Sequence, residues 1–180
     1  MTGSVALLRG INVGGKNLIR MPDLAAAFHD AGYADARTYI QSGNVVFSHD
    51  GPGGSALETR VEGVLEERLG LPLVVVTRSR DELAAIVDAA PASHGDPERR
   101  SDVIFLKHPV SAAEVHAEFP EPREGVDEIA VGDGVIYASR LAALASKSRI
   151  SRITQLPSYR SMTIRNWRTT TRLLAMLDEG

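Results

Sequence analysis

Hydrophobic residues along the chain alternate between short continuous runs and longer runs with helical spacing. The short runs are rich in β-branched and aromatic residues, and their length favours strands over helices. They cover residues 5–8, 37–40, 45–47, 73–76, 103–106, 128–131, 135–138 and 161–164. The pattern therefore predicts a strand at each of these eight places.

Helix starts are marked by a serine that is followed three residues later by a glutamate, the pattern of a reciprocal capping box. These pairs are Ser55 with Glu58, Ser79 with Glu82, and Ser111 with Glu114. A further helix is predicted to begin at Pro22 and end before Gly32, because proline suits the first turn and glycine the end. Residues 141–156 contain helix-compatible stretches, and the last helix is predicted over 165–177.

The order of these elements indicates an α+β fold built from two similar units. The first half has the order βαββαβα, and the second half repeats this order with residues 141–156 in the place of the second helix. Residues 91–100 are rich in Pro, Ser, Gly and Asp and form the best linker. We therefore predict units over 1–92 and 93–180, each with helices packed against a sheet that contains antiparallel strands, and residues 5–8 as a central strand.

Composition excludes several classes of protein. The chain has 180 residues, of which 43% are hydrophobic and 24% charged, which is typical of a globular protein. No apolar run approaches the roughly 20 residues of a membrane helix, and no signal peptide is evident, so a cytoplasmic protein without a membrane partner is expected. The absence of cysteine excludes disulfides, thiol nucleophiles and cysteine-bound metals.

Charge is segregated although the net charge is only −3. Residues 102–133 are predominantly acidic, whereas residues 140–172 carry arginines and lysine and no acidic residue. Such a basic block can contact an anionic partner such as nucleic acid, or it can simply be a solvated helix face. The five histidines are scattered without metal-ligand spacing, so no metal site is predicted, and no catalytic residue is identified.

The loop that follows the first strand, residues 10–17 with the sequence GINVGGKN, is the main candidate site. Gly10, Gly15 and Lys16 fit the spacing of a phosphate-binding P-loop, but Asn17 stands where that motif has Ser or Thr. Two interpretations remain. The glycines can serve only the turn, or the backbone N–H groups can form an anion nest with Lys16 and the flanking arginines Arg9 and Arg20.

A second loop is expected beside the first. A right-handed crossover brings the ends of the first two strands to one edge of the sheet, so residues 41–44 should lie next to residues 10–17. Because Gly and Asn are also favoured in turns for conformational reasons, a purely structural role is the alternative. The candidate ligand-binding residues at this rim are Arg9, Asn12, Gly14, Gly15, Lys16, Asn17, Gln41, Ser42 and Asn44.

The basic start of the last helix adds Arg165, Asn166 and Arg168 to the candidates, with Arg172 expected on the same stripe. If both clusters serve one ligand, the helix N-terminus and Lys16 should border one crevice. As exposed residues, Lys16 and Arg165 are then expected to tolerate alanine with less than about 0.5 kcal/mol of destabilisation.

Three stretches resemble one family: VALLRGINVGGKN at 5–17, YIQSGNVVF at 39–47 and TIRNWRT at 163–169. They are similar to the domain of unknown function 1697 family, although Ile164 and Arg172 stand where the family commonly has threonine and lysine. The resemblance implies a duplicated α+β fold with ferredoxin-like βαββαβ units and additional helices, and it implies no activity.

The leading functional hypothesis is the binding of an anionic or nucleotide-like ligand at residues 10–17. The alternatives are an enzyme that acts on a phosphorylated or nucleotide substrate at the same rim, and a nucleic-acid-binding module that uses the basic C-terminal segment. The sequence defines neither a cofactor nor an oligomeric state.

Overall fold

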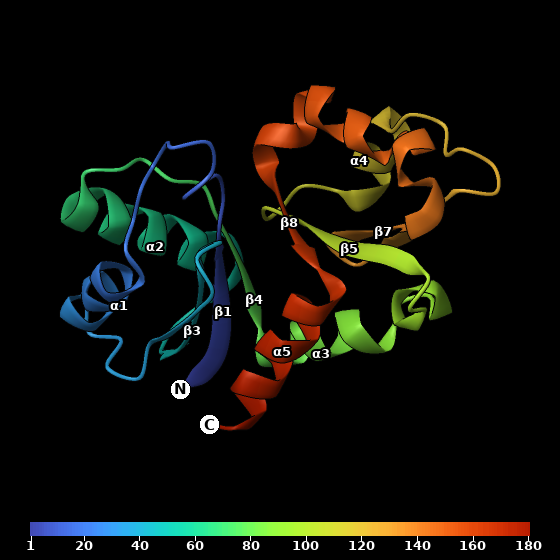
Figure 1. The fold of residues 1–180 in the computed structure, drawn as a ribbon. Helices are drawn as coiled ribbons and strands as arrows, with labels where there is room; N and C mark the ends of the chain where they lie inside the picture. Colours follow the sequence, from blue (N-terminus) through green and yellow to red (C-terminus); the bar gives the residue numbers. More distant parts are fainter. The chain divides into compact units, whose positions relative to one another are not determined.

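The computed structural model describes residues 1–180 and contains two four-stranded antiparallel sheets with helices, which is an α+β fold (Figure 1). Residues Met1–Ala84 and Arg172–Gly180 form one compact unit, here called unit 1, and Ala85–Thr171 form unit 2. This division differs from the sequence-based one at residues 92 and 93. Helices α3 (Arg80–Asp88) and α5 (Trp167–Asp178) each contribute residues to both units.

The sheet of unit 1 has the strand order β2-β3-β1-β4, with every neighbouring pair antiparallel. The strand predicted at residues 5–8 is confirmed as central, and all of these residues are buried because strands cover both edges and side chains cover both faces. The predicted hairpin of the second and third strands is also confirmed. The elements before α3 are β1 (Thr2–Leu8), α1 (Met21–Asp30), β2 (Arg37–Tyr39), β3 (Asn44–His49), α2 (Gly54–Leu69) and β4 (Val75–Ser79).

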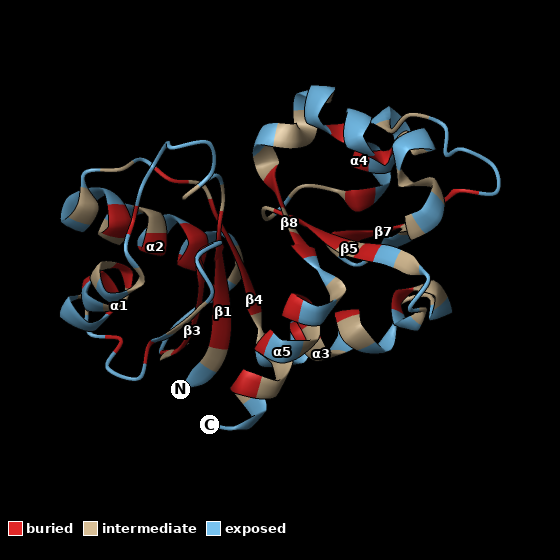
Figure 2. Cartoon of the chain, in the orientation of Figure 1, coloured by how far each residue is buried: buried red, intermediate tan, exposed pale blue.

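Helices α1 and α2 cover one face of this sheet, and their apolar residues form its core (Figures 1 and 2). The rings of Phe47 in β3, Phe28 in α1 and Tyr33 contact one another: the centroid of Phe47 lies 5.2 and 4.9 Å from those of Phe28 and Tyr33, which are 5.7 Å apart. Helix α2 contributes Leu57, Val61 and Leu65 at the predicted helical spacing. Gly70 ends α2 in the left-handed conformation, as the sequence predicts.

The capping box predicted for Ser55 and Glu58 is wrong. Helix α2 begins at Gly54, its N-cap residue is Gly53, and no side chain caps it. Glu58 is instead fully buried, where Oε1 accepts the N–H of Thr77 at 3.0 Å, and Glu62 accepts the N–H of Val75 at 2.9 Å. Strand β4 lies at the edge of the sheet, and both N–H groups point away from its one neighbour, β1. The two carboxylates, one helical turn apart on α2, therefore accept hydrogen bonds from backbone groups that have no partner in a neighbouring strand.

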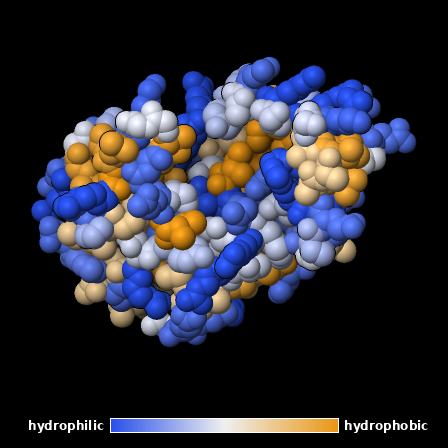
Figure 3. All heavy atoms as spheres, in the orientation of Figure 1, coloured by the Kyte–Doolittle hydropathy of each residue, from blue (hydrophilic) through white to orange (hydrophobic).

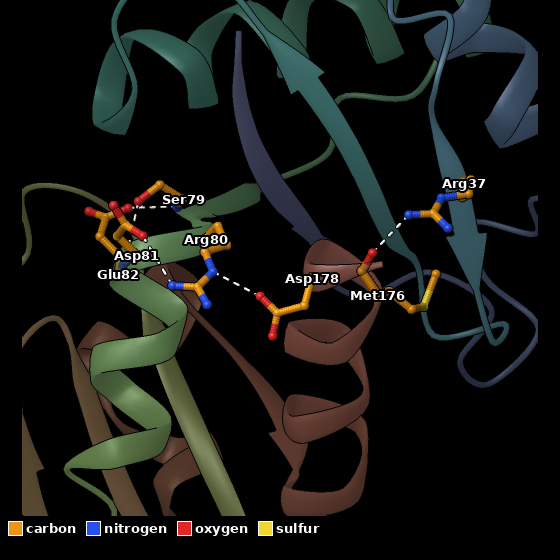
Figure 4. A network of polar contacts seen from close by, with 7 residues as sticks. All are labelled: Arg37, Ser79, Arg80, Asp81, Glu82, Met176 and Asp178. Atoms are coloured by element: carbon orange, nitrogen blue, oxygen red, sulfur yellow. Dashed lines mark hydrogen bonds and ion pairs between the residues drawn. The ribbon is translucent and has the colours of Figure 1, made fainter. Parts of the chain in front are cut away.

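Of the other two predicted capping boxes, the one at Ser79 is reciprocal, whereas the one at Ser111 has only the serine cap. Ser79 Oγ accepts the N–H of Glu82 at 3.2 Å, and Glu82 Oε2 accepts the N–H of Ser79 at 2.7 Å (Figure 4). Ser111 Oγ accepts the N–H of Glu114 at 3.4 Å and begins α4.

The C-terminal part of α5 is anchored within unit 1 by polar contacts (Figure 4). Arg37 Nη2 donates to the carbonyl oxygen of Met176 at 2.8 Å, and Arg80 Nε donates to Asp178 Oδ1 at 2.9 Å. The helix begins at Trp167 rather than at residue 165 as predicted. The two preceding residues belong to strand β8.

Unit 2 has a sheet of order β6-β7-β5-β8, again antiparallel throughout. Its strands match the predicted runs closely, and α4 covers the face formed by Ile104, Leu106, Ile136 and Ala138. The elements are β5 (Arg99–Leu106), α4 (Ala112–Glu118), β6 (Asp127–Gly132), β7 (Val135–Leu141) and β8 (Met162–Asn166), with a 3-10 helix η1 (Ala92–Gly95) before β5.

The helix-compatible stretch after β7 forms 3-10 helices instead of a regular α-helix. These are η2 (Ala142–Lys147), η3 (Ile150–Gln155) and η4 (Pro157–Ser161). The buried carboxylate of Asp127 holds this segment by accepting the N–H groups of Arg149 and Arg123. Burial opposes ionisation, but hydrogen bonds from Ser148 and from these N–H groups hold the pKa of Asp127 below its usual value. Backbone donors that bond to this carboxylate and to Ser148 Oγ cannot continue a regular helix.

Candidate functional site

The loop over residues 10–17 closes on itself as a tight turn. Lys16 donates its N–H to the carbonyl oxygen of Val13 at 3.1 Å, and Gly14 and Gly15 between them have φ angles of 59° and 73°. Positive φ at both central positions is the requirement of a type I′ turn, which glycine meets without strain. The two glycines thus have a conformational role. The helix that a P-loop requires at its lysine does not follow, because α1 begins only at Met21.

Asn12 connects this loop to the loop between β2 and β3. Its Nδ2 donates to the carbonyl oxygens of Ile19 and Gln41, both at 2.9 Å, and its Oδ1 accepts the N–H of Ile19 at 2.8 Å. The neighbouring position of the two loops, predicted from the crossover, is confirmed by the bond to Gln41. Asn17 adds a further brace, from Nδ2 to the carbonyl oxygen of Gly10 at 3.1 Å.

The loop between β2 and β3 is held by a buried amide. Asn44 is fully buried, and its Nδ2 donates to the carbonyl oxygen of Tyr39 at 2.8 Å and to Ser42 Oγ at 3.0 Å. Ile40 has a φ of 49°, which is a strained conformation for a β-branched residue, and its side chain is 47% exposed. The side chains of Ser42 and Asn44 therefore stabilise the turn.

The same two loops, here called the rim (residues 10–18 and 40–43), expose side chains of two kinds. Lys16 and Gln41 are exposed, and their side chains make no hydrogen bond or ion pair. Beside them in sequence, Val13, Leu18 and Ile40 are 67%, 74% and 47% exposed. Figure 3 shows hydrophobic atoms at the surface next to hydrophilic ones. The sequence interpretation missed these apolar residues, although three large aliphatic side chains within loops are a recognisable signal of an exposed contact surface.

The candidates at the C-terminal end do not form the predicted arginine stripe. Arg165 lies in β8, is only 6% exposed, and donates Nη1 to Thr163 Oγ1 at 2.8 Å and to the carbonyl oxygen of Ile164 at 2.9 Å. Burial lowers the pKa of Arg165 to about 10, so the side chain stays cationic at neutral pH. Arg172 donates to Glu179 at 2.7 Å.

Of the remaining C-terminal candidates, one has a structural role and one is exposed. Asn166 Oδ1 accepts the N–H of Thr169 at 2.8 Å and so caps α5, whereas Arg168 is exposed. Arg9 is half-buried and donates its N–H to the carbonyl oxygen of Val74. Because Lys16 belongs to unit 1 and Arg165 to unit 2, a crevice shared by both residues stays a prediction.

The model of one protein family, described as protein of unknown function (DUF1697), matches residues 1–137. The chain belongs to the DUF1697 family. The resemblance inferred from the motifs is thus confirmed, although the third motif, at 163–169, lies outside the matched residues. A solved structure of the conserved bacterial protein SP0830 from Streptococcus pneumoniae is similar along 98% of both chains, with 26% identity and a TM-score of 0.85. A search of curated proteins finds no match.

In this DUF1697 protein, no helix has the length and apolar character needed to cross a membrane. The rim has to be interpreted from its own side chains, since neither the family nor the similar streptococcal protein is described by a ligand.

The brace at Asn12 leads to a first prediction. Asn12→Ala removes hydrogen bonds to both loops and places alanine at a φ of 53°, so we expect the free energy of unfolding to fall by about 2 kcal/mol. Asn17→Ala, at a φ of 48°, loses one exposed bond and should cost about half as much. Urea denaturation of both variants measures the difference, and equal losses would contradict the bracing role of Asn12.

Proposed function

We propose that this protein binds an anionic, nucleotide-like ligand at the rim. The observation that carries the proposal is the combination, on two mutually braced loops, of an unpaired lysine and an unpaired glutamine with exposed aliphatic side chains. Lysine binds phosphate, the amide of Gln41 can pair with the edge of a base, and aliphatic side chains can cover its face. A ligand that carries both an anionic and a flat apolar part uses all three.

Preorganisation of the rim supports the same proposal. The N–H groups of Gly14 and Gly15 form no intramolecular hydrogen bond and lie at the tip of a turn that ends at Lys16. Strain at Ile40 is held by the buried amide of Asn44, and strained backbone of this kind is concentrated at functional sites. A loop held in one conformation before binding loses less entropy when a ligand is bound.

Binding of nucleic acid through the basic C-terminal segment is the alternative, although the arginine stripe predicted on the last helix is lost. Arg165 is buried and Arg172 is paired with Glu179. The exposed cations of this segment are Lys147, Arg152, Arg160 and Arg168. Phosphate-backbone binding depends on several accessible cations, so the salt dependence of binding distinguishes this alternative from binding at the rim.

We also propose that the two units are copies of one ferredoxin-like ancestor. Support comes from the strand orders, which agree when β1 to β4 are matched with β5 to β8. In this match Arg78 corresponds to Arg165, and both are buried and donate Nη1 to the carbonyl oxygen of the preceding residue. The residues that follow these arginines, Ser79 and Asn166, also correspond. The side-chain oxygen of each accepts the N–H of the residue three positions later and caps the helix that begins there.

The binding proposal is tested by a thermal-shift screen of nucleotides, phosphosugars and short oligonucleotides, followed by titration of the best ligand. Lys16→Ala and Gln41→Ala should each weaken that ligand about tenfold and change stability by less than about 0.5 kcal/mol, because both residues are exposed. Lys147→Ala removes the same charge from an exposed position in unit 2 and serves as the matched control.

Two results would contradict binding at the rim: no stabilising ligand in the screen, or an equal loss of affinity in Lys16→Ala and Lys147→Ala. Chemical turnover of the bound ligand would identify an enzyme at the same rim. A steep loss of affinity with salt, without discrimination among oligonucleotides, would instead indicate binding to a phosphate backbone.

A further inference from the structure

A second candidate site lies in unit 1 at the opposite end of β1 from the rim. It is a cavity of about 350 Å³, lined by side chains near the start of β1, the end of β3 and the end of β4, and by the loop that precedes α2. This volume lies within the range typical of small-molecule sites. The rim, by contrast, follows Leu8 at the other end of β1.

The floor of the cavity is polar although it is almost completely buried. Ser4, His49 and Thr77 line it from the neighbouring strands β1, β3 and β4, and they are 1%, 4% and 1% exposed. Ser4 Oγ and His49 Nε2 are hydrogen-bonded at 3.0 Å. His49 Nδ1 and Thr77 Oγ1 have no hydrogen-bond partner. Buried polar atoms without partners destabilise a fold, so an occupant that supplies partners is favoured here.

The wall of the cavity favours negative charge. Helix α2, 16 residues long, begins beside the cavity at Gly54, with no side-chain cap and no acidic residue in its first turn. Its first N–H groups and its positive dipole end are therefore available to an anion. Arg60 does not line the cavity, but it holds the loop whose glycines do, because it donates to the carbonyl oxygens of Asp50 and Pro52 at 3.2 and 3.3 Å.

One acidic side chain also lines the cavity. Glu82 is exposed at the opening, and its carboxylate accepts the N–H of Ser79 at 2.7 Å. A carboxylate in this position repels a bare anion but accepts a hydrogen bond from a hydroxyl group. It therefore favours a ligand that carries hydroxyl groups beside its anionic part.

Unit 2 fills the corresponding place differently. By strand register, Asp102, Arg140 and Ile164 occupy the positions that Ser4, His49 and Thr77 occupy in unit 1. Asp102 and Arg140 form an ion pair at 3.7 Å, and Ile164 presents no polar atom to the smaller cavity of about 200 Å³. The polar groups of unit 2 are thus paired with each other, whereas unit 1 keeps unpaired polar atoms around a larger space.

We propose that the cavity of unit 1 binds a phosphate group, carried by a small hydroxylated phosphomonoester. The N-terminal N–H groups of α2 and the hydroxyl of Thr77 donate to the phosphate oxygens. When Ser4 donates to His49 Nε2, the tautomer places a proton on Nδ1 and makes it a further donor. Glu82 accepts a hydroxyl of the ligand. This site is separate from the rim and does not depend on the function proposed there.

The test is a titration of the full-length protein with inorganic phosphate and with glycerol phosphate at constant ionic strength, followed by amide NMR. Saturable shifts are expected for the first residues of α2. Thr77→Val keeps the side-chain size and removes the unpaired hydroxyl, and it should weaken binding about tenfold. Ile164→Val, at the corresponding position of unit 2, is the matched control and should leave the affinity unchanged. If Thr77→Val does not fold, Ser4→Ala tests the second donor, because it removes the hydroxyl that bonds to His49 Nε2 and so directs the proton to Nδ1. It should also weaken binding.

Shifts that do not saturate, or an affinity that Thr77→Val and Ser4→Ala leave unchanged, would overturn the proposal and leave a cavity filled by water. A loss of phosphate binding in Lys16→Ala would also overturn it, because the phosphate would then bind at the rim. A glycerol phosphate affinity about tenfold above that of inorganic phosphate is expected from the contact with Glu82. Equal affinities would overturn the assignment of a phosphomonoester.

Discussion

Replacing Gly43 by alanine is expected to lower the free energy of unfolding by about 3 to 5 kcal/mol, the largest effect of a single methyl group in unit 1. Gly43 has a φ of 81°, which costs any other residue conformational energy. A Cβ atom there would lie 2.5 Å from Ile11 Cδ1 and 2.9 Å from Leu8 Cβ. Leu8 cannot move aside, because its N–H is bonded to the carbonyl oxygen of Gly43 at 2.8 Å within the sheet.

The steric part of this effect can be separated from the conformational part. Gly15 has a similar φ of 73°, but a Cβ atom there would meet nothing within 4 Å. Gly15→Ala should therefore cost only the conformational part, about 1 to 2 kcal/mol. Urea denaturation followed by circular dichroism measures both variants. Equal losses would show that the contact with Leu8 and Ile11 is relieved by movement of the loop.

Arg165→Ala is expected to destabilise the protein by about 3 kcal/mol, in contrast to the negligible effect that the sequence suggested. Its side chain is 6% exposed and bonds to Thr163 Oγ1 and to the carbonyl oxygen of Ile164. Truncation leaves a cavity and removes a donor from both acceptors. Thermal and urea denaturation measure the loss.

Arg168→Ala is the matched control for Arg165→Ala. It also truncates an arginine, three residues further along the chain, but this arginine is exposed. It should change stability by less than about 0.5 kcal/mol. A similarly small change in Arg165→Ala would mean that Arg165 leaves its buried position at little cost, and it would restore Arg165 as a candidate ligand-binding residue.

Sequence patterns predicted most of the elements because their determinants are local. The serine caps at Ser79 and Ser111 involve residues three positions apart, and the hairpin of β2 and β3 depends on its turn. The pair Ser55 and Glu58 has the same spacing but fails. Its glutamate instead accepts the backbone N–H of Thr77 in β4. The need of this N–H group for an acceptor arises only when the sheet is assembled.

The neighbouring position of the two loops of the rim was predictable, because the order and direction of the strands alone bring these loops together. The burial of Arg165 was not predictable, because a basic residue near the end of a strand that leads into a helix fits either an exposed or a packed position. The polar floor of the cavity was also invisible to spacing rules. Ser4, His49 and Thr77 are far apart along the chain and meet only through strand register.

The carboxylates of Glu58 and Glu62 have a consequence for assembly. They occupy the outward N–H groups of Thr77 and Val75, so an extended peptide that approaches β4 finds its donors already bonded. At the other side of the sheet, β2 offers an edge of only three residues. The sheet of unit 1 is thus closed to strand addition, which protects it from the edge-to-edge growth that leads to fibrils.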